Sequence, residues 1–348
     1  MAEIGTAENN DSLKIDKQKV YSFLLDGRIN DAIVYVNCID SEKLLEKDLD
    51  LKNKIIEKFG GEKDNSIFIN SNNVGLDEIL IIFRNYWRKS FIIGNEFDDE
   101  LISELYEFLN KNLIIPKTTF EKKDQDSLNH YLKEFVKSQG FITTGFGRTG
   151  SYLDFLCWET EEDTIYTFEI HNEILAPKVI RMKNFLSLGW QEYATFNTFY
   201  PGGWATKEAI YYVDSAFKTD SENFLVGYLA HEGQHLRDYK FYPKLTGADL
   251  EYRAKLTELS MYQDYIYNFL QFTISNSNYE SKNAHSIANY CVVRDMSRKL
   301  FEKDFENDIE KWKEISVVKL NETAEELFRE NTESLDKIGS EVQNYIKQ

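Results

Sequence analysis

The stretch GYLAHEGQHLRDYK, at residues 227–240, places His231 and His235 four positions apart, with Glu232 directly after the first histidine. On an α-helix, residues at i and i+4 share one face with about 5 to 6 Å between their Cβ atoms. Two imidazole nitrogens at that spacing can both reach one zinc ion at about 2.0 to 2.1 Å. Glu232 is rotated about 100° from His231 on a helix. It is therefore free to accept a proton from a metal-bound water.

The flanking residues predict the helix that this arrangement requires. Thr219 and Glu222 have the spacing of a capping box, and apolar residues between 224 and 229 supply a buried stripe. Pro243 disfavours helical geometry at Tyr242 and should end the helix there. We therefore expect a helix over about residues 220–240.

A third ligand is expected on the next helix, because catalytic zinc usually has three protein ligands and one open position. The following segment, ADLEYRAKLTELSMY at residues 248–262, carries Glu251 and Glu258. If it begins near residue 248 and runs antiparallel, Glu251 lies near the level of His235 and Glu258 about 10 Å further along. This geometry favours Glu251 as the ligand. Glu258 is the second choice, or a partner that orients a ligand.

The sequence HEGQH followed by EYRAK resembles the gluzincin zinc metallopeptidases, in which an HExxH helix precedes a helix that carries a glutamate ligand. The resemblance covers about residues 207–262. It implies Zn²⁺ as the cofactor, with His231, His235 and Glu251 as its ligands. It also implies that Glu232 acts as the general base.

One position departs from the family pattern. Ala254 matches the small residue of the family's E-x-x-A-[DN] run, but Lys255 stands where the family has an acidic or amide residue. In the family that residue orients the first histidine, so in this sequence another residue has to orient His231. Glu258, two turns after Glu251, is a plausible substitute partner for His231.

The resemblance also implies a substrate-binding strand and a group that stabilises the oxyanion. ATKEAIYYVD, at residues 205–214, stands where the family has an edge strand that pairs with an extended substrate, although an interior strand fits the pattern equally well. The oxyanion group is expected opposite Glu232, from a later helix. NAHSIANY, at residues 283–290, offers His285 and Tyr290, of which we favour His285. His130 and His171 have no partner at ligand spacing, so we interpret them as structural or surface residues.

The pattern along the chain predicts an α+β fold that is mostly α. Residues 1–118 read as an N-terminal helical region, and residues 119–348 as a gluzincin-like catalytic domain. In that domain we expect a small, mainly antiparallel sheet at about 143–214, active-site helices at about 220–275 and C-terminal helices to 348. SYLDFLCWE and DTIYTFEI flank the polar residues 160–163, which predicts a hairpin turn there.

Composition excludes some partners. Forty-one basic and 59 acidic residues give a formal charge of −18, which repels nucleic acid and anionic membrane surfaces. No apolar run is long enough to insert into a membrane. The N-terminus lacks signal-peptide features, which favours a cytoplasmic protein. An exported or periplasmic protein is the alternative if the native chain has lost a signal peptide. The three cysteines are widely separated, which predicts buried free thiols, and nothing sets the oligomeric state.

Together these features predict a zinc-dependent hydrolase, with a metallopeptidase acting on peptide or protein substrates as the leading interpretation. A zinc hydrolase of a non-peptide amide or ester uses the same chemistry and is one alternative. A zinc-stabilised interaction protein without catalysis is another. Glu232 argues against the last, because a purely structural site needs no base beside its first ligand.

Overall fold

The computed structural model describes residues 13–61, 64, 72–94, 97–112, 124–281 and 283–346. The chain divides into two compact units, each built from two segments. The first unit comprises Met1–Thr160 and Asn184–Pro201, and the second comprises Glu161–Lys183 and Gly202–Gln348. The boundary that we expected near residue 118 lies outside the described residues. The first compact unit continues past that point and takes in part of the expected sheet region.

The first unit is mainly helical. Its helices are α1 (Lys17–Leu25), α2 (Ile29–Asn37), the 3₁₀ turn η1 (Ser41–Lys43), α3 (Glu46–Phe59), α4 (Val74–Ile93), α5 (Asp98–Lys111), α6 (Gln125–Ser138) and α7 (Trp190–Ala194). Their apolar faces form one core with the first strands. Phe83 stacks on Phe155 with ring centroids 4.8 Å apart, and the indole of Trp87 donates to the carbonyl of Leu153 at 2.8 Å.

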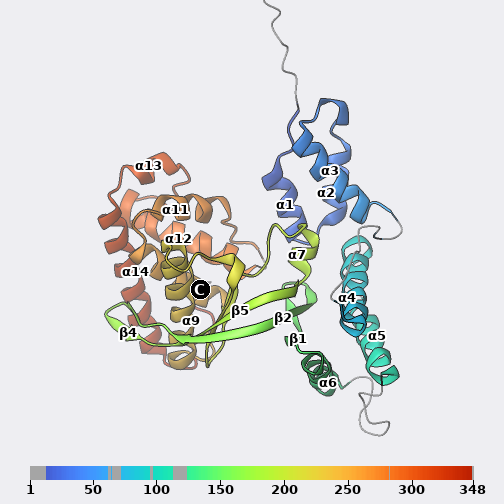
Figure 1. The fold of residues 1–348 in the computed structure, drawn as a ribbon. Coiled ribbons are helices and arrows are strands. Elements are labelled where there is room, and N and C mark those ends of the chain that lie inside the picture. Colours follow the sequence, from blue (N-terminus) through green and yellow to red (C-terminus); the bar gives the residue numbers. More distant parts are fainter. Residues whose placement is uncertain are drawn as a thin grey trace, which may run out of the picture. The chain divides into compact units, whose positions relative to one another are not determined.

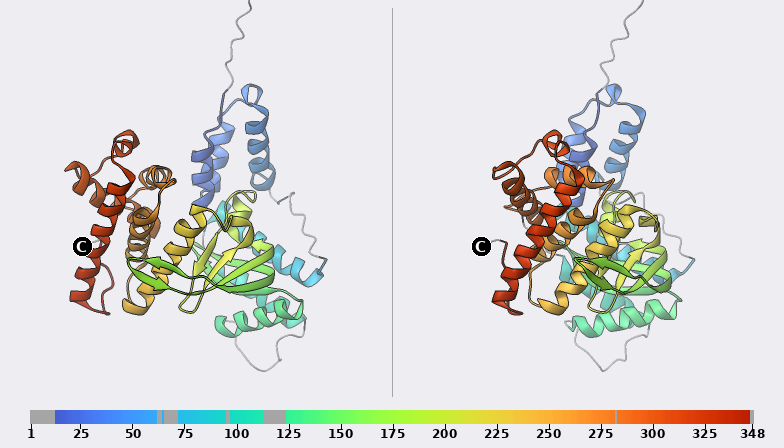
Figure 2. Two further views of the ribbon diagram at one scale, coloured as in Figure 1. Left: turned by 60° about the vertical axis from the view of Figure 1, so that its left-hand side comes forward. Right: turned by 90° about the vertical axis from the view of Figure 1, so that its left-hand side faces the viewer.

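A five-stranded sheet has the order β1-β2-β5-β7-β6. The strands are β1 (Ile142–Thr149), β2 (Tyr152–Ile165), β5 (Lys178–Leu188), β6 (Gly203–Ala205) and β7 (Ile210–Val213). Figure 2 shows its long, curved strands from two sides. The pairs β1–β2 and β6–β7 are antiparallel, but β5 and β7 are parallel, so the sheet is mixed where we expected mainly antiparallel pairing. The reason is that the chain makes a crossover through α7 before β7 pairs with β5.

The hairpin turn predicted at residues 160–163 is wrong. These residues continue β2, whose first half is buried and whose second half is exposed. The polar side chains mark a strand that extends beyond the core, and they do not mark a turn. The short hairpin of this region comes later, from β3 (Phe168–Ile170) and β4 (Glu173–Leu175).

The second unit carries the remaining helices of the described residues, and Figure 1 shows α9, α11, α12 and α14 grouped together. The helical elements of the second unit are the 3₁₀ turn η2 (Asp214–Ala216), α8 (Glu222–Phe224), the π-helical segment η3 (Leu225–Ala230), α9 (His231–Phe241), α10 (Gly247–Met261), α11 (Ile266–Ser275), α12 (Ala284–Phe301), α13 (Ile309–Lys313) and α14 (Val317–Ile338). Helix α10 packs against α9, α12 and α14, and its residues 252–259 are all buried. The expected α+β class, mostly α, is confirmed.

The helix that carries the histidines differs from a regular α-helix. Its N-cap is Ser221, whose side chain accepts from the Phe224 amide, so the predicted capping box at Thr219 is wrong. Glu222 instead accepts from the amides of Gln263 and Tyr265. A π-helical segment runs up to the residue before His231, and such segments often occur at functional sites. The predicted end is confirmed, because α9 stops at Phe241, two residues before Pro243.

Two further predictions, on membrane-spanning helices and on the cysteines, can be compared with the structure. No helix among the described ranges is long and apolar enough to cross a membrane. All three cysteines are free thiols, and Cys157 and Cys291 are buried as expected. Cys38 is exposed, contrary to the prediction, because it lies at the C-terminal cap of the short helix α2.

Candidate metal centre

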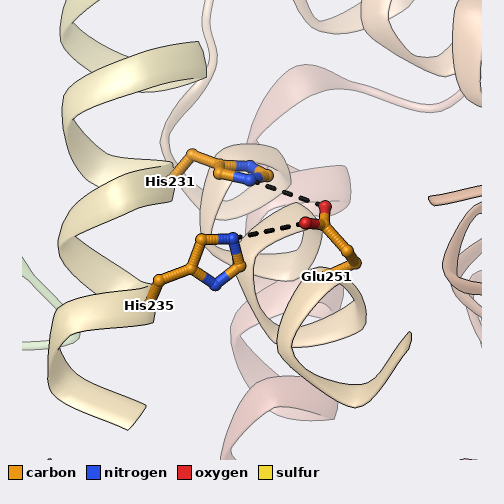
Figure 3. Close-up of side chains that lie close together, drawn as sticks. All are labelled: His231, His235 and Glu251. Atoms are coloured by element: carbon orange, nitrogen blue, oxygen red, sulfur yellow. Dashed lines mark ion pairs between the residues drawn. The ribbon is translucent and has the colours of Figure 1, made fainter. Parts of the chain in front are cut away.

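Three side chains that sequence analysis singled out converge in the second unit. His231 and His235 project from one face of α9, and Glu251 projects from the first turns of α10 (Figure 3). The Nε2 atom of His231 lies 3.5 Å from Oε2 of Glu251, and the Nε2 atom of His235 lies 3.4 Å from Oε1. One potential ligand atom from each residue lies within 4.8 Å of the other two. The two imidazoles share one face of α9, as the i, i+4 spacing predicted, and the Glu251 carboxylate faces both of them.

The other nitrogen of His231 is held by Glu258. Its Nδ1 donates to Oε1 of Glu258 at 2.7 Å, and the Glu258 side chain is only 5% exposed. With the proton on Nδ1, the Nε2 atom of a neutral His231 presents its lone pair to the Glu251 carboxylate. Two acceptors that face each other in a buried place need a cation between them. Carboxylates that orient metal-binding histidines in this way are common beside metal ions.

The electrostatics of the group also favour a cation. Burial by itself lowers the pKa of His231, but the carboxylates of Glu258 and Glu251 outweigh burial and raise that pKa to about 9. Burial also opposes ionisation of Glu251, yet the surrounding histidines hold its pKa well below the usual range. The group therefore carries an excess of negative charge that either a proton or a metal ion can offset.

The donor set fits zinc. Two imidazole nitrogens and one carboxylate form a three-ligand set typical of catalytic zinc sites. Oε2 of Glu251 is buried, and its neighbour at 2.7 Å is Nδ1 of the largely exposed His285, with which it forms an ion pair when that imidazole is protonated. An unsatisfied buried carboxylate oxygen costs free energy unless a ligand such as a metal ion satisfies it. Among the described residues, this is the group of histidine, cysteine and acidic side chains with a metal-binding arrangement.

Glu232 is placed beside this group and not within it. The side chain is half-buried, and among the residues that the structure describes it makes no hydrogen bond or ion pair. The negative charge of Glu232 contributes to the raised pKa of His231. Burial raises the pKa of Tyr228 and of Tyr239, and the charge of Glu232 adds to both increases. The carboxylate is therefore close to the candidate ligands and remains available to take a proton.

The two candidates for the oxyanion group have different surroundings. His285 lies in the first turn of α12, with its side chain 60% exposed and its Nδ1 2.7 Å from Oε2 of Glu251. Tyr290 instead packs between Tyr279 and Phe305, with ring centroids 5.3 and 5.2 Å away. The structure brings His285 to the candidate ligands. In the described part of the chain, no contact joins Tyr290 to them.

The departure from the family pattern has a physical counterpart. Ala254 is fully buried, as a small packed residue should be. Lys255 is also buried, and its ammonium lies 5.8 Å from the centre of the Phe269 ring, where it contacts no candidate ligand. The contact with His231 is made by Glu258 one turn later.

The edge of the sheet is not the predicted strand. Residues 210–213 form β7, which lies between β5 and β6, so the interior alternative for that strand holds. The edge strand is β6, only three residues long. At Gly203 in β6, a Cβ atom would lie 2.1 Å from the carbonyl oxygen of Tyr211 and 2.2 Å from the hydroxyl of Tyr228. Glycine is needed there because the strand approaches the helix closely.

A buried polar network that joins α9, α10 and α14 was missed by sequence reasoning. Arg253 donates to Asp238 at 2.8 Å and to Asn331 on α14 at 2.6 Å, and both members of the Arg253–Asp238 pair are fully buried. Gln234 donates to Asp238 at 2.8 Å. Because the ion pair joins the histidine helix to the Glu251 helix, it fixes the two helices against each other.

The hairpin β3–β4 adds to this network. His171, in the turn of the hairpin, contacts the hydroxyl of Thr257 at 2.8 Å and Glu325 at 2.5 Å, and its ring stacks on Phe328 with centroids 3.5 Å apart. His171 is thus a structural residue, as predicted. The available sequence signal was the i, i+4 spacing of Gln234 with Asp238 and of Arg253 with Thr257, which places polar residues on one face of each helix.

Comparisons with protein-family models, with curated proteins and with solved structures give no match for this chain. The resemblance to gluzincins therefore depends on the residues of the site and their spacing.

Proposed function

We propose that this chain is a zinc-dependent metallopeptidase. The observation that carries the proposal is the convergence of His231 and His235 on the Glu251 carboxylate, at 3.5 and 3.4 Å, with Glu258 holding the other nitrogen of His231. A structural zinc site would normally have four protein ligands, whereas this group offers three. The neighbouring Glu232, which has no partner of its own among the described residues, supports catalysis over a purely structural role.

Each residue then has a separate task. His231, His235 and Glu251 would hold zinc, which lowers the pKa of a bound water towards about 7 and polarises a carbonyl group. Glu232 would accept a proton from the attacking water and pass it to the leaving amine. His285, exposed at the start of α12, would donate a hydrogen bond to the developing oxyanion once its imidazole turns away from Glu251. The substrate would be a peptide or protein segment.

The test combines metal analysis with cleavage. The purified chain should bind one zinc ion, measured by elemental analysis after dialysis, and should cleave members of a mixed peptide library followed by mass spectrometry. Glu232→Gln should keep the zinc and lose cleavage by roughly a hundredfold or more, because general-base catalysis contributes about 10²- to 10⁴-fold. Glu169→Gln is the matched control, since Glu169 is an exposed glutamate on β3, and it should cleave like the wild type.

Each result has a separate meaning. Equal cleavage by Glu232→Gln and wild type would contradict the assigned base. A chain that binds zinc and cleaves amide or ester substrates, but not peptides, would replace the peptidase with the wider hydrolase class. Zinc binding with no hydrolysis of any of these substrates would leave only a zinc-stabilised interaction protein.

A further inference from the structure

The first unit contains a polar cavity that has no part in the metal centre. Its volume is about 190 Å³. Among the described residues, its walls carry two cationic and two acidic side chains, namely Lys58, Arg84, Asp64 and Glu192. Sites for drug-sized ligands start at about 300 Å³. This cavity is smaller, so its size suits a molecule of a few heavy atoms.

Lys58 is fixed in place by the cavity wall. Its ammonium donates to the carbonyl of Tyr193 at 2.7 Å and lies 3.9 Å from the centre of the Tyr193 ring and 5.1 Å from that of Phe196. Burial lowers the pKa of Lys58 to about 8, with a smaller contribution from Arg84, although the charges of Asp64 and Glu192 act in the opposite direction. A negatively charged neighbour stabilises the charged form of a buried ammonium group.

Arg84 is the group whose hydrogen-bonding capacity is unused. It is half-buried on α4, and in the described ranges its guanidinium makes no hydrogen bond or ion pair. It lies 6.0 Å from the centre of the Tyr193 ring, and its charge acts on Glu192 without a direct contact. A guanidinium has five N–H donors in a planar fork that matches a carboxylate. An arginine that is half-buried beside a cavity, with no anion bound to it, points to a ligand that supplies one.

The two acidic residues limit what this ligand can be. Asp64 accepts from the hydroxyl of Tyr193 at 2.7 Å, and Oε2 of Glu192 accepts from the amide of Leu188 at 2.7 Å. Burial raises the pKa of Glu192, and the charges of Arg84 and Lys58 offset this rise only in part. A simple anion would meet two carboxylates as well as two cations. A molecule with one positive and one negative group would match both pairs.

The rim of the cavity is conformationally strained. Phe196 and Asn197 have φ of 55° and 63°, and Asn197 lines the cavity. Left-handed geometry at residues other than glycine persists where the surroundings enforce it, often beside a ligand. This turn places Asn197 in the cavity lining and the Phe196 ring 5.1 Å from the ammonium of Lys58.

We propose that this cavity binds a small zwitterion of amino-acid size. Its carboxylate pairs with Arg84 and Lys58, and its ammonium group pairs with Glu192 and Asp64. The proposal does not depend on the metal centre, because every residue of the cavity belongs to the first unit.

Isothermal titration calorimetry of the full chain tests it. The ligands are the standard amino acids, a set of their N-acetylated and carboxamide derivatives, and sodium acetate and inorganic phosphate. We expect at least one free amino acid to bind, and both of its blocked forms to bind roughly 10- to 100-fold more weakly, as expected for the loss of one charged hydrogen-bonded group. Arg84→Met should weaken binding by a similar factor. Arg28→Met, which removes an exposed arginine paired with Asp31 in the same unit, should bind like the wild type.

Three results would overturn the proposal. One is a folded wild-type chain that binds none of the amino acids in the millimolar range. The second is binding of acetate or phosphate as tight as that of the amino acid, which would indicate a simple anion site. The third is unchanged affinity in Arg84→Met. The first two need no variant, so the proposal is testable even if Arg84→Met does not fold.

Discussion

Replacing Glu258 with glutamine should weaken zinc binding without removing a ligand. Glu258 is buried and accepts the Nδ1 hydrogen of His231 at 2.7 Å, so it fixes the imidazole with Nε2 facing Glu251. Loss of such a partner typically weakens metal binding about 10- to 100-fold, which corresponds to about 1.4 to 2.7 kcal/mol. Glutamine keeps the shape and can still accept that hydrogen, and only the charge is lost. We therefore expect the lower end, about tenfold.

The measurement is competition for zinc against a chromophoric chelator, with circular dichroism to verify folding. The matched control is Glu325→Gln, which alters another histidine–carboxylate pair, between Glu325 and His171, at 2.5 Å. His171 is not a candidate ligand, so zinc affinity should stay within about twofold of the wild type in this control.

The reasoning would be refuted by a folded Glu258→Gln chain whose zinc affinity equals that of the wild type. It would also be refuted if Glu325→Gln lost as much affinity, because the effect would then come from general weakening of the unit. A larger loss in Glu258→Ala than in Glu258→Gln is expected as well, since alanine removes both the charge and the acceptor.

Three other changes have defined outcomes. Gly233→Ala should destabilise the second unit by roughly 1 to 3 kcal/mol, measured by urea unfolding, because a Cβ there would lie 2.7 Å from the Phe168 ring; unchanged stability would show that the ring moves aside freely. Arg253→Met should cost about 3 to 5 kcal/mol, seen as a lower thermal midpoint, because it leaves Asp238 buried and unpaired; a small effect would mean that water reaches Asp238. Asp154→Asn should stabilise the chain by up to about 3 kcal/mol above pH 6, because burial raises the Asp154 pKa to about 6. Ionisation of Asp154 therefore destabilises the fold as pH rises from 4 to 6. The extra free energy of unfolding of Asp154→Asn, measured with denaturant, should vanish below about pH 4. Extra stability that persists at low pH would show that it does not come from the charge of Asp154.

Sequence reasoning worked best where the interacting residues are close along the chain. The placement of His231, Glu232 and His235 follows from helical spacing, and Pro243 marks the end of their helix because its effect on Tyr242 is local. Glu251 could be preferred over Glu258 because a short connection leaves little freedom in how an antiparallel helix begins. These parts of the fold and of the candidate site are set by backbone geometry over a few residues.

The pairing of strands that lie far apart along the chain could not be predicted from such local spacing. Residues 160–163 are polar enough for a turn, yet they continue β2, and the crossover before β7 makes its pairing with β5 parallel. The π-helical segment before His231 also has no clear sequence mark. Strand pairing and helix register depend on which surfaces meet in the folded chain, and periodicity describes only one surface at a time.

The sequence by itself determined that His231, Glu232 and His235 lie together on one helix, because their spacing along that helix requires no distant partner. Only the tertiary structure decided that Glu258 holds His231 and that His285, and not Tyr290, reaches Glu251. It alone also brought Arg84 and Glu192 to one cavity. Such contacts join residues that are distant along the chain, and their geometry is set by how whole helices and strands pack.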